Sequence, residues 1–275
     1  MLIRIKDDFD IDKIISSGQC FRPCIVNSDD KIYTYRFITK DHVLYMNKTD
    51  KNDTYEISCS KKEWEDIWED YFDLKLDYSS VRLSIRKEDR YMIECADCGN
   101  GIRILNQDKW EMLISFIISQ RKSIPAIRSC VEKLCERYGK KIKTDRESVY
   151  LFPTPDKLIN VSQDELSECG LGYRVGYIID AVKKVYLGDI DLDLIADLDD
   201  ESLYNELIKI KGVGTKVANC VMLFSYHRTG RAPVDVWIKR VIEEHYAGID
   251  PFPSYKENAG IMQQYVFYHS INKKY

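Results

Sequence analysis

The sequence predicts an α+β protein, in which an N-terminal antiparallel β-sheet is followed by a mostly α-helical body. Residues 1 to about 60 form short segments rich in β-branched and aromatic residues, separated by Asp, Asn and Lys turns. No long helical pattern interrupts these segments, which favours an antiparallel sheet. From Ser60 onward, apolar residues recur with helical spacing. We therefore predict two domains: residues 1–104 hold the sheet and its flanking helices, and residues 105–275 hold the helical body.

The composition is typical of a soluble globular protein. The chain has 275 residues, 44% of them hydrophobic and 31% charged, and this length suits two or three subdomains. No apolar run approaches the roughly 18 residues of a membrane span, and the N-terminus lacks a signal-peptide core. We expect a cytoplasmic protein without membrane contact. Because the net charge is −4, binding to nucleic acid would have to come from a local surface.

The nine cysteines are expected to be reduced thiols, because their number is odd and no leader is visible. Cys95 and Cys98 have zinc-ligand spacing, but a structural zinc needs two further ligands. Cys20 and Cys24 are the candidates, and no histidine has ligand spacing. We therefore predict no metal site at these residues. The chain also lacks the Cys-x6-Cys-x2-Cys-x5-Cys run of an iron–sulfur cluster.

The N-terminal half should contain five strands and several short helices. The strands are expected near Leu2–Ile5, Phe21–Val26, Ile32–Ile38, Val43–Met46 and Tyr55–Cys59. A short helix, Ile11–Ile15, precedes the link that holds Gly18 and Gln19. Ser60 and Glu63 have the spacing of a capping box that opens the helix Trp64–Phe72. Further short helices are predicted at Tyr78–Ile85 and Tyr91–Cys95.

The body should be built from longer helices. Asp108 is placed to cap Trp110–Ser119, whose apolar residues form one buried stripe. The next helix, Ile124–Tyr138, ends at Gly139. The remaining predicted helices are Pro155–Asn160, Ser162–Cys169, Tyr173–Leu187, Asp235–Tyr246 and Glu257–Ile271.

The stretch Leu207–Phe224 has the pattern of a helix, a glycine-rich turn and a second helix, within a helix-hairpin-helix spanning about residues 202–226. Gly212 and Gly214 flank Val213, so the turn can adopt positive φ and approach a partner closely. The second helix should begin near Thr215, and its first N–H groups would then be available to a phosphate. The alternative is an ordinary helical hairpin.

Lys216 and Asp235 are the candidate catalytic residues. Lys216 falls in the first turn of the second helix, where a cation has the wrong sign for the helix dipole. Such a lysine either turns into solvent or has its pKa lowered towards that of a working nucleophile. Asp235 is placed as the N-cap of the following helix. An amine beside an anion that stabilises a cationic transition state would suit nucleophilic catalysis, whereas Asp235 alone could simply be a cap.

These residues resemble the helix-hairpin-helix DNA glycosylase superfamily, and within it the 8-oxoguanine DNA glycosylase branch. The resemblance rests on Lys211–Cys220 with Pro233 and Asp235, and four further stretches agree in chain order. These are Ser17–Arg22, Ser115–Ile117, Gly170–Arg174, and Ala259–Gly260 with Gln263 and Phe267. The missing cysteine run separates the chain from the endonuclease III and adenine glycosylase branches. The lysine separates it from the alkylbase glycosylases.

The resemblance implies the fold and the reaction. The N-terminal sheet would be like that of TATA-binding protein. Neutral Lys216 would attack the sugar C1′ of a flipped nucleotide and displace the base, while Asp235 stabilises the developing sugar cation. The resulting Schiff base would permit β-elimination, so the enzyme would also cut the abasic strand. It would act in base excision repair.

The resemblance also assigns the base pocket. Gly18 would accept the N7 hydrogen that distinguishes 8-oxoguanine from guanine. Gln263 would bond the Watson–Crick edge, Phe267 and Cys220 would lie against the two faces of the base, and Pro233 would complete the pocket. Without the resemblance, Phe267 and Cys220 would be interpreted as core residues.

The same resemblance assigns DNA contacts. Tyr173 and Arg174 would wedge and hold the duplex, although helix-start packing is the alternative. Gly212, Val213 and Gly214 would offer N–H groups to a phosphate.

Two departures concern the opposite strand and a phosphate. Arg121 stands at the first position of the asparagine run of eukaryotic members, and Ala126 stands where they carry an arginine that reads cytosine. We therefore predict relaxed opposite-base preference. Trp237 replaces a histidine of the eukaryotic pattern, which affects a phosphate contact.

Three functions follow from these observations. The first is a bifunctional glycosylase/lyase for 8-oxoguanine that works as a monomer on double-stranded DNA of the nucleoid. It would require no cofactor, although the hairpin carbonyls could hold a structural cation. The second is a glycosylase of the same scaffold for other damaged bases. The third is a catalytically silent helix-hairpin-helix DNA-binding protein.

Overall fold

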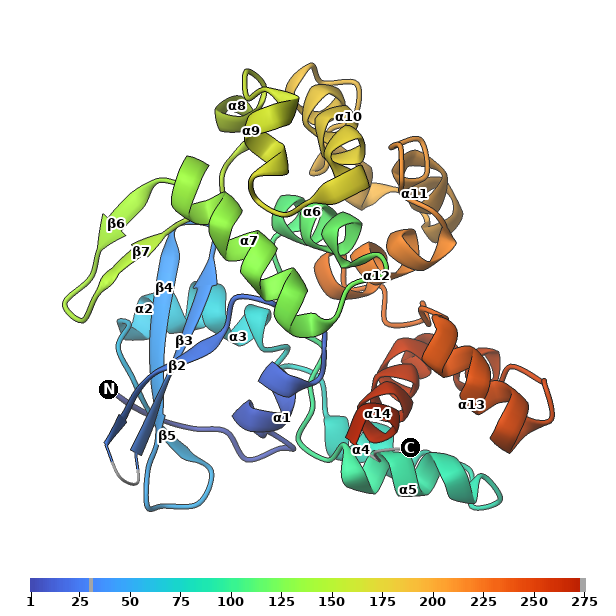
Figure 1. Cartoon of the computed structure of the whole chain (residues 1–275). Coiled ribbons are helices and arrows are strands. Elements are labelled where there is room, and N and C mark those ends of the chain that lie inside the picture. The colour runs from blue at the N-terminus through green and yellow to red at the C-terminus, as the bar shows by residue number, and fades with distance from the viewer. Residues whose placement is uncertain (30–31, 273–275) are drawn as a thin grey trace. The chain divides into compact units, whose positions relative to one another are not determined.

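The computed structural model describes residues 1–29 and 32–272, which form two compact units (Figure 1). Unit 1 comprises Met1–Phe37, Val43–Asn106 and His227–Tyr275, and unit 2 comprises Ile38–His42 and Gln107–Tyr226. This division differs from the predicted domains 1–104 and 105–275. The first boundary lies close to the prediction, but the C-terminal helices belong to the same unit as the N-terminal sheet.

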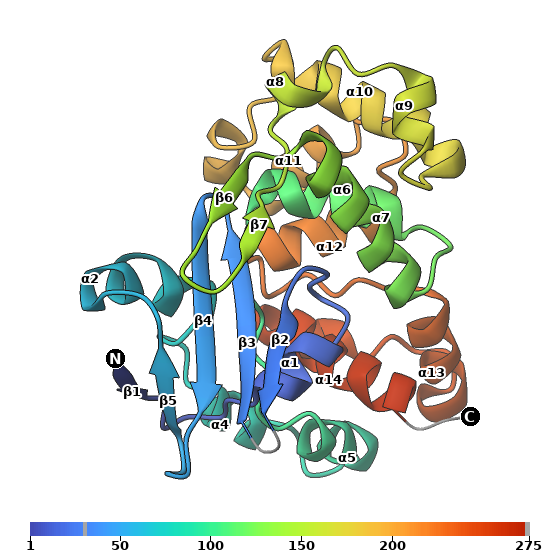
Figure 2. The ribbon, with the colours of Figure 1, turned by 60° about the vertical axis from the view of Figure 1, so that its left-hand side comes forward.

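Unit 1 contains the predicted antiparallel sheet. Its five strands have the order β1-β5-β4-β3-β2, and Figure 2 shows them side by side. The strands are β1 (Leu2–Arg4), β2 (Cys24–Asp29), β3 (Ile32–Thr39), β4 (His42–Lys48) and β5 (Thr54–Ile57). All five predicted strands are confirmed, with ends that differ by a few residues.

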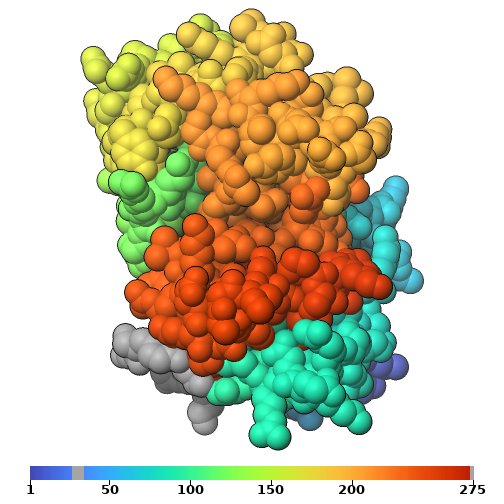
Figure 3. All heavy atoms as spheres, turned by 90° about the vertical axis from the view of Figure 1, so that its right-hand side faces the viewer, coloured from blue at the N-terminus to red at the C-terminus, as the bar shows by residue number. Residues whose placement is uncertain are grey.

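The helices of unit 1 come from both ends of the chain. They are α1 (Ile11–Ser16), α2 (Lys61–Glu63), the π-helix η1 (Trp64–Trp68), α3 (Glu69–Tyr71), α4 (Tyr78–Leu83), α5 (Arg90–Cys98), α13 (Val236–Tyr246), the 3₁₀ segment η4 (Phe252–Asn258) and α14 (Ala259–Asn272). Helix α14 packs against α5, η4 and α13, and Figure 3 shows this group of helices from outside. Ten of the 14 residues of α14 are buried, which is typical of a helix that packs against several neighbours.

A π-helical turn follows the predicted cap at Ser60. The Ser60 side chain accepts a hydrogen bond from the Glu63 N–H, which confirms this residue as the N-cap. The Glu63 carboxylate accepts from Trp68 Nε1 over 3.3 Å. Trp64 and Trp68, the first and last residues of this wider π-helical turn, are both buried.

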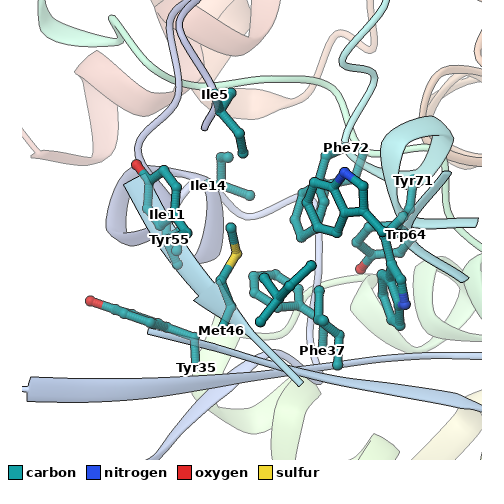
Figure 4. Packing of buried hydrophobic residues seen from close by; sticks show 14 of the residues in the cluster. Ile5, Ile11, Ile14, Tyr35, Phe37, Met46, Tyr55, Trp64, Tyr71 and Phe72 are labelled. Carbon is teal, nitrogen blue, oxygen red and sulfur yellow. The ribbon is translucent and has the colours of Figure 1, made fainter. Parts of the chain in front are cut away.

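The core of unit 1 is an aromatic cluster on one face of the sheet (Figure 4). Phe72 lies at its centre, fully buried, with ring-centroid distances of 5.4 Å to Phe9, 5.0 Å to Phe37 and 5.1 Å to Tyr71. These three pairs have edge-on geometry, which aromatic quadrupoles prefer. Ile11 and Ile14 of α1 extend the same cluster, so the core holds the helix that precedes Gly18.

Unit 2 is helical apart from one small hairpin. Its elements are α6 (Lys109–Ser119), α7 (Ile124–Tyr138), β6 (Lys141–Lys143), β7 (Ser148–Tyr150), α8 (Pro155–Leu158), α9 (Gln163–Ser167), η2 (Gly172–Arg174), α10 (Val175–Tyr186), η3 (Leu194–Asp197), α11 (Asp200–Leu207) and α12 (Thr215–Ser225). Helix α6 is buried between α7 and α12. Asp108 caps α6 by accepting from the Glu111 N–H over 2.8 Å, and burial raises the pKa of its carboxyl group.

The mostly helical body also contains the short hairpin of β6 and β7, which the sequence interpretation did not include. These strands pair antiparallel, with Ile142 opposite Val149. Both segments alternate one apolar residue with polar neighbours, so the two-residue period of a strand was present but short.

Within residues 1–29 and 32–272, no helix is long and apolar enough to cross a membrane. No group of three or more His, Cys, Asp or Glu side chains in that part of the chain could hold a metal ion. None of the cysteines described there forms a disulfide.

We predict that Phe72→Ala lowers the free energy of unfolding by about 3–5 kcal/mol, because it opens a cavity among packed aromatic rings. Urea titration followed by circular dichroism measures this loss. Leu83→Ala is the control, since its side chain is 79% exposed and should change stability by less than about 0.5 kcal/mol. Equal effects of the two substitutions would contradict the assignment of Phe72 to the centre of the core.

Candidate functional site

The predicted site residues are divided between the two units. Unit 2 carries Arg121, Tyr173, Arg174, Gly212, Val213, Gly214, Lys216 and Cys220. Unit 1 carries Gly18, Pro233, Asp235, Trp237, Gln263 and Phe267. Within each unit the structure brings several of these residues together, and each group is described by itself.

The hairpin turn depends on Gly212. Its φ is +84°, and a Cβ at this position would lie 2.3 Å from Cδ2 of Tyr177. Gly214 is different: as the N-cap of α12 it has φ −95°, and no described atom lies within 4 Å of its Cβ position. Only the first glycine therefore adopts the left-handed conformation expected for the turn.

Hydrogen bonds fasten the hairpin to its surroundings. The Val213 N–H donates to the Ile210 carbonyl over 3.0 Å, so the predicted phosphate contact rests on the neighbouring amides. The Lys211 N–H donates to Asp180 Oδ2 over 2.7 Å. Gln120, at the end of α6, donates through Nε2 to the Gly212 carbonyl over 3.1 Å. The turn is held on both sides.

Lys216 is the second residue of α12, and α12 begins at Thr215 as predicted. Its side chain is half-buried, and Nζ lies 5.2 Å from the ring centroid of Phe116. Phe116 stacks in turn on Phe224, with centroids 5.5 Å apart. An aromatic face attracts an ammonium group. The Phe116 ring therefore holds the Lys216 amine at a defined position against an apolar surface. Cys220 lies one turn further along α12 and is buried.

Tyr173 and Arg174 follow two glycines with positive φ, Gly170 and Gly172. The Tyr173 ring is 55% exposed, whereas Arg174 is only 5% exposed. The Arg174 guanidinium lies 4.3 Å from the Tyr173 ring centroid, donates through Nη1 to the Leu171 carbonyl over 3.2 Å, and bonds through Nη2 to the Gln120 carbonyl. Arg174 therefore supports Tyr173 from within, and Tyr173 is the member of the pair that faces outward.

Gln120 and Tyr177 join this Tyr173 loop to the hairpin. Gln120 accepts from Arg174 at its carbonyl and donates to Gly212 through its side chain. Tyr177 fills the space beside Gly212 and meets the Tyr173 ring edge-on at 5.9 Å. The exposed aromatic ring and the lysine-bearing hairpin thus belong to one packed group.

Arg121 lies in the loop between α6 and α7 and is exposed. Its φ is +51°, which is unusual for a residue with a side chain. The next residue, Lys122, donates to the Gly170 carbonyl over 3.0 Å. This bond ties the loop to the same group and leaves the Arg121 side chain on the surface.

Asp235 of unit 1 is the N-cap of α13, as predicted. Its Oδ1 accepts from the Ile238 N–H over 2.9 Å. Asp235 is half-buried, and Pro233, two residues earlier, is buried. Trp237 is 46% exposed, and the Arg240 guanidinium lies 5.3 Å from its ring centroid. The start of α13 therefore presents an anion, an aromatic ring and a cation.

Gly18 lies in the turn after α1 with φ +78° and is half-buried. Gln263 of α14 is 4% exposed, and its Oε1 has no hydrogen-bond partner among the described residues. A buried unpaired amide oxygen is costly, so this atom is a candidate to meet a ligand. Phe267 follows one turn later and is half-buried.

The sequence interpretation did not single out Gln120, Tyr177 or Gln264. The available signal was weak: Gln264 directly follows Gln263 in the sequence, and Gln120 is the C-cap of α6. Their partners are far away in the chain, so no local pattern reveals them.

Two family descriptions together match residues 1–265. Residues 1–113 match the N-terminal domain of 8-oxoguanine DNA glycosylase, and residues 114–265 match the HhH-GPD superfamily base excision DNA repair proteins. The chain belongs to the HhH-GPD superfamily. The N-terminal match assigns it to the 8-oxoguanine DNA glycosylase branch of this superfamily.

Solved structures of this branch are similar over almost their whole length. MBOgg1 in complex with a low-affinity DNA ligand is 35% identical with a TM-score of 0.90, covering 98% of this chain and 94% of that chain. The apo-form of Clostridium acetobutylicum 8-oxoguanine glycosylase/lyase is 33% identical with a TM-score of 0.88, covering 97% and 95%.

A curated relative is the N-glycosylase/DNA lyase of Saccharomyces cerevisiae. It is 35% identical over 158 residues, which is 53% of this chain and 42% of the yeast protein. The chain therefore spans less than half the length of the yeast glycosylase in this match.

We predict that the two hairpin glycines differ in their tolerance of a side chain. Gly212→Ala should lower the free energy of unfolding by about 2 kcal/mol or more, because alanine opposes positive φ and its Cβ would collide with Tyr177. Gly214→Ala should cost less than about 1 kcal/mol, since the space there is open. Thermal unfolding of both variants provides the measurement. A similar loss for both would mean that the left-handed turn is not the constraint.

Proposed function

We propose that this protein is a bifunctional DNA glycosylase and abasic-site lyase that excises 8-oxoguanine from double-stranded DNA. The observation that carries the proposal is Lys216, seated on Phe116 at the start of α12, in a chain of this glycosylase branch. A second structure of the Clostridium acetobutylicum 8-oxoguanine glycosylase/lyase supports the substrate, because it was solved in complex with double-stranded DNA containing cytosine opposite 8-oxoguanine. It is 32% identical to this chain and has a TM-score of 0.86.

In the proposed mechanism the neutral amine of Lys216 attacks C1′ of the damaged nucleotide. The bond from C1′ to the base breaks, and the base leaves with the electron pair and takes up a proton. Opening of the sugar ring and loss of the amine proton give an iminium, the Schiff base. Loss of a C2′ proton then expels the 3′-phosphate, so the strand is cut.

Asp235 has a different part in this mechanism. Positive charge develops on the sugar as the base departs, and a nearby carboxylate lowers the energy of that state. The capping bond to the Ile238 N–H fixes the direction of the Asp235 side chain. It leaves the carboxylate one oxygen that is not engaged in this bond.

Base recognition in the proposal uses two acceptors of unit 1. The Gly18 carbonyl would accept the N7 hydrogen of 8-oxoguanine, which guanine lacks. The buried, unpaired Oε1 of Gln263 would accept from the N–H groups of the Watson–Crick edge. A site built on hydrogen bonds rejects a molecule that lacks the donor, and Phe267 of unit 1 would lie against the ring.

The DNA contacts of the proposal follow the exposed residues. Tyr173 would fill the place of the extruded base, with Arg174 as its support, while Gly212, Gly214 and Trp237 would lie near phosphates.

We propose a monomer that needs no cofactor. A structural cation at the hairpin carbonyls is an option that thermal unfolding with and without potassium would test.

Borohydride trapping tests the enzyme directly. A duplex with 8-oxoguanine should give a covalent adduct with wild-type protein, because borohydride reduces the Schiff base to a stable amine. Lys216→Gln should give none, and Lys211→Gln, which removes another lysine of the same hairpin, should trap normally. The absence of an adduct with every lesion duplex would favour a silent DNA-binding protein.

Opposite-base selectivity is predicted to be relaxed, because Arg121 and Ala126 replace the residues that read cytosine in the eukaryotic pattern. Single-turnover excision is measured with each of the four bases opposite 8-oxoguanine. A preference for cytosine above about 100-fold, or ~2.7 kcal/mol, would contradict this prediction. A panel of other lesions in the same duplex separates 8-oxoguanine from the alternative of another damaged base.

A further inference from the structure

The turn that carries Gly18 is held by two buried side-chain amides. Gln264 of α14 is buried and donates through Nε2 to the Ser17 carbonyl over 2.6 Å. Gln19 is also buried, donates to Ser17 Oγ over 2.9 Å and accepts from the Leu105 N–H over 2.8 Å. The Ser17 carbonyl before Gly18 and the Gln19 side chain after it are thus both held by buried hydrogen bonds.

Gln264 also relates this turn to Gln263. Consecutive residues of an α-helix point about 100° apart, so Gln264 reaches the turn while the adjacent Gln263 keeps an unpaired buried oxygen. Helix α14 therefore connects the two groups that the proposed function assigns to the base, the Gly18 carbonyl and the Gln263 amide.

We infer that Gln264 is a positioning residue that determines specificity for an oxidised purine. It holds the Ser17–Gly18 peptide so that the next carbonyl, that of Gly18, has the direction needed to accept an N7 hydrogen. Hydrogen bonds weaken steeply when their angle departs from linear, so a rotated turn would lose the contact. This inference rests on the proposed function.

The reason for a glutamine at this position is the Ser17 carbonyl. A buried carbonyl without a donor carries the full cost of lost hydration. If Gln264 could not donate, the peptide would have to rotate towards another donor. The Gly18 carbonyl would rotate with it, because positive φ at glycine allows such movement.

The test uses Gln264→Met, which keeps a similar length and volume but has no N–H donor. Two activities of the same protein are compared: single-turnover excision of 8-oxoguanine, and cleavage of a preformed abasic site. The second uses the lysine chemistry without any base to recognise. We expect excision to fall by about 10-fold or more, while abasic-site cleavage stays within about 2-fold of wild type.

The matched control is Ser270→Ala, on the same helix. Its buried Oγ donates to the Val266 carbonyl of the same helix over 2.8 Å, so both activities should remain at the wild-type level. Unchanged excision by Gln264→Met would overturn the inference. A parallel fall of both activities, together with a lower melting temperature, would also overturn it, because the role would then be structural.

Failure of the proposed function can be distinguished from failure of the inference. If the proposed function is wrong, wild-type protein leaves 8-oxoguanine in place, whatever its effect on abasic DNA, and the inference is wrong as well. If wild-type protein excises the base and only the variant comparison fails, the inference alone is wrong.

Discussion

The hairpin turn at Gly212 has no room for a side chain, and the organisation of unit 2 depends on this constraint. Tyr177 occupies the space beside the glycine and meets the exposed Tyr173 ring. Gln120 bonds to the Gly212 carbonyl on one side and to Arg174 on the other. These contacts link the hairpin to the Tyr173 loop at two places. They therefore fix the position of the lysine-bearing helix relative to that loop. Rigid support of this kind is what a nucleophile needs for orientation.

Unit 1 solves a similar problem around Gly18. Here too an irregular piece of backbone is buried, and a glutamine side chain supplies the missing donor. A neutral amide suits this task, because it satisfies a buried carbonyl without the desolvation cost of an ion. Gln120 in unit 2 and Gln264 in unit 1 thus have the same structural role, because each side-chain amide donates to a backbone carbonyl of a glycine turn. Each holds a glycine turn to which the proposed reaction assigns a contact with DNA or base.

The residues assigned to the nucleotide contrast with the residues that support them. Tyr173, Trp237 and Arg121 are exposed, whereas Arg174 and Gln264 are buried. The exposed set also contains two of the positions at which the chain departs from the eukaryotic pattern. Under the proposed function, changes at these surface positions would alter which strand or phosphate is contacted and would leave the buried hydrogen bonds of the scaffold intact. One scaffold could in this way accept different opposite-base rules.

Local sequence determined the strands of the sheet, the caps at Asp108 and Asp235, the start of α12 at Thr215 and the turn at Gly212. These features depend on a few neighbouring residues, because caps and turns are satisfied within one helical turn. Only the tertiary structure decided that Arg174 turns inward, that α14 belongs to the unit of the N-terminal sheet, and that Gln264 bonds to Ser17. That last contact joins residues 247 positions apart, and no spacing pattern in a single sequence records a hydrogen bond between such distant groups.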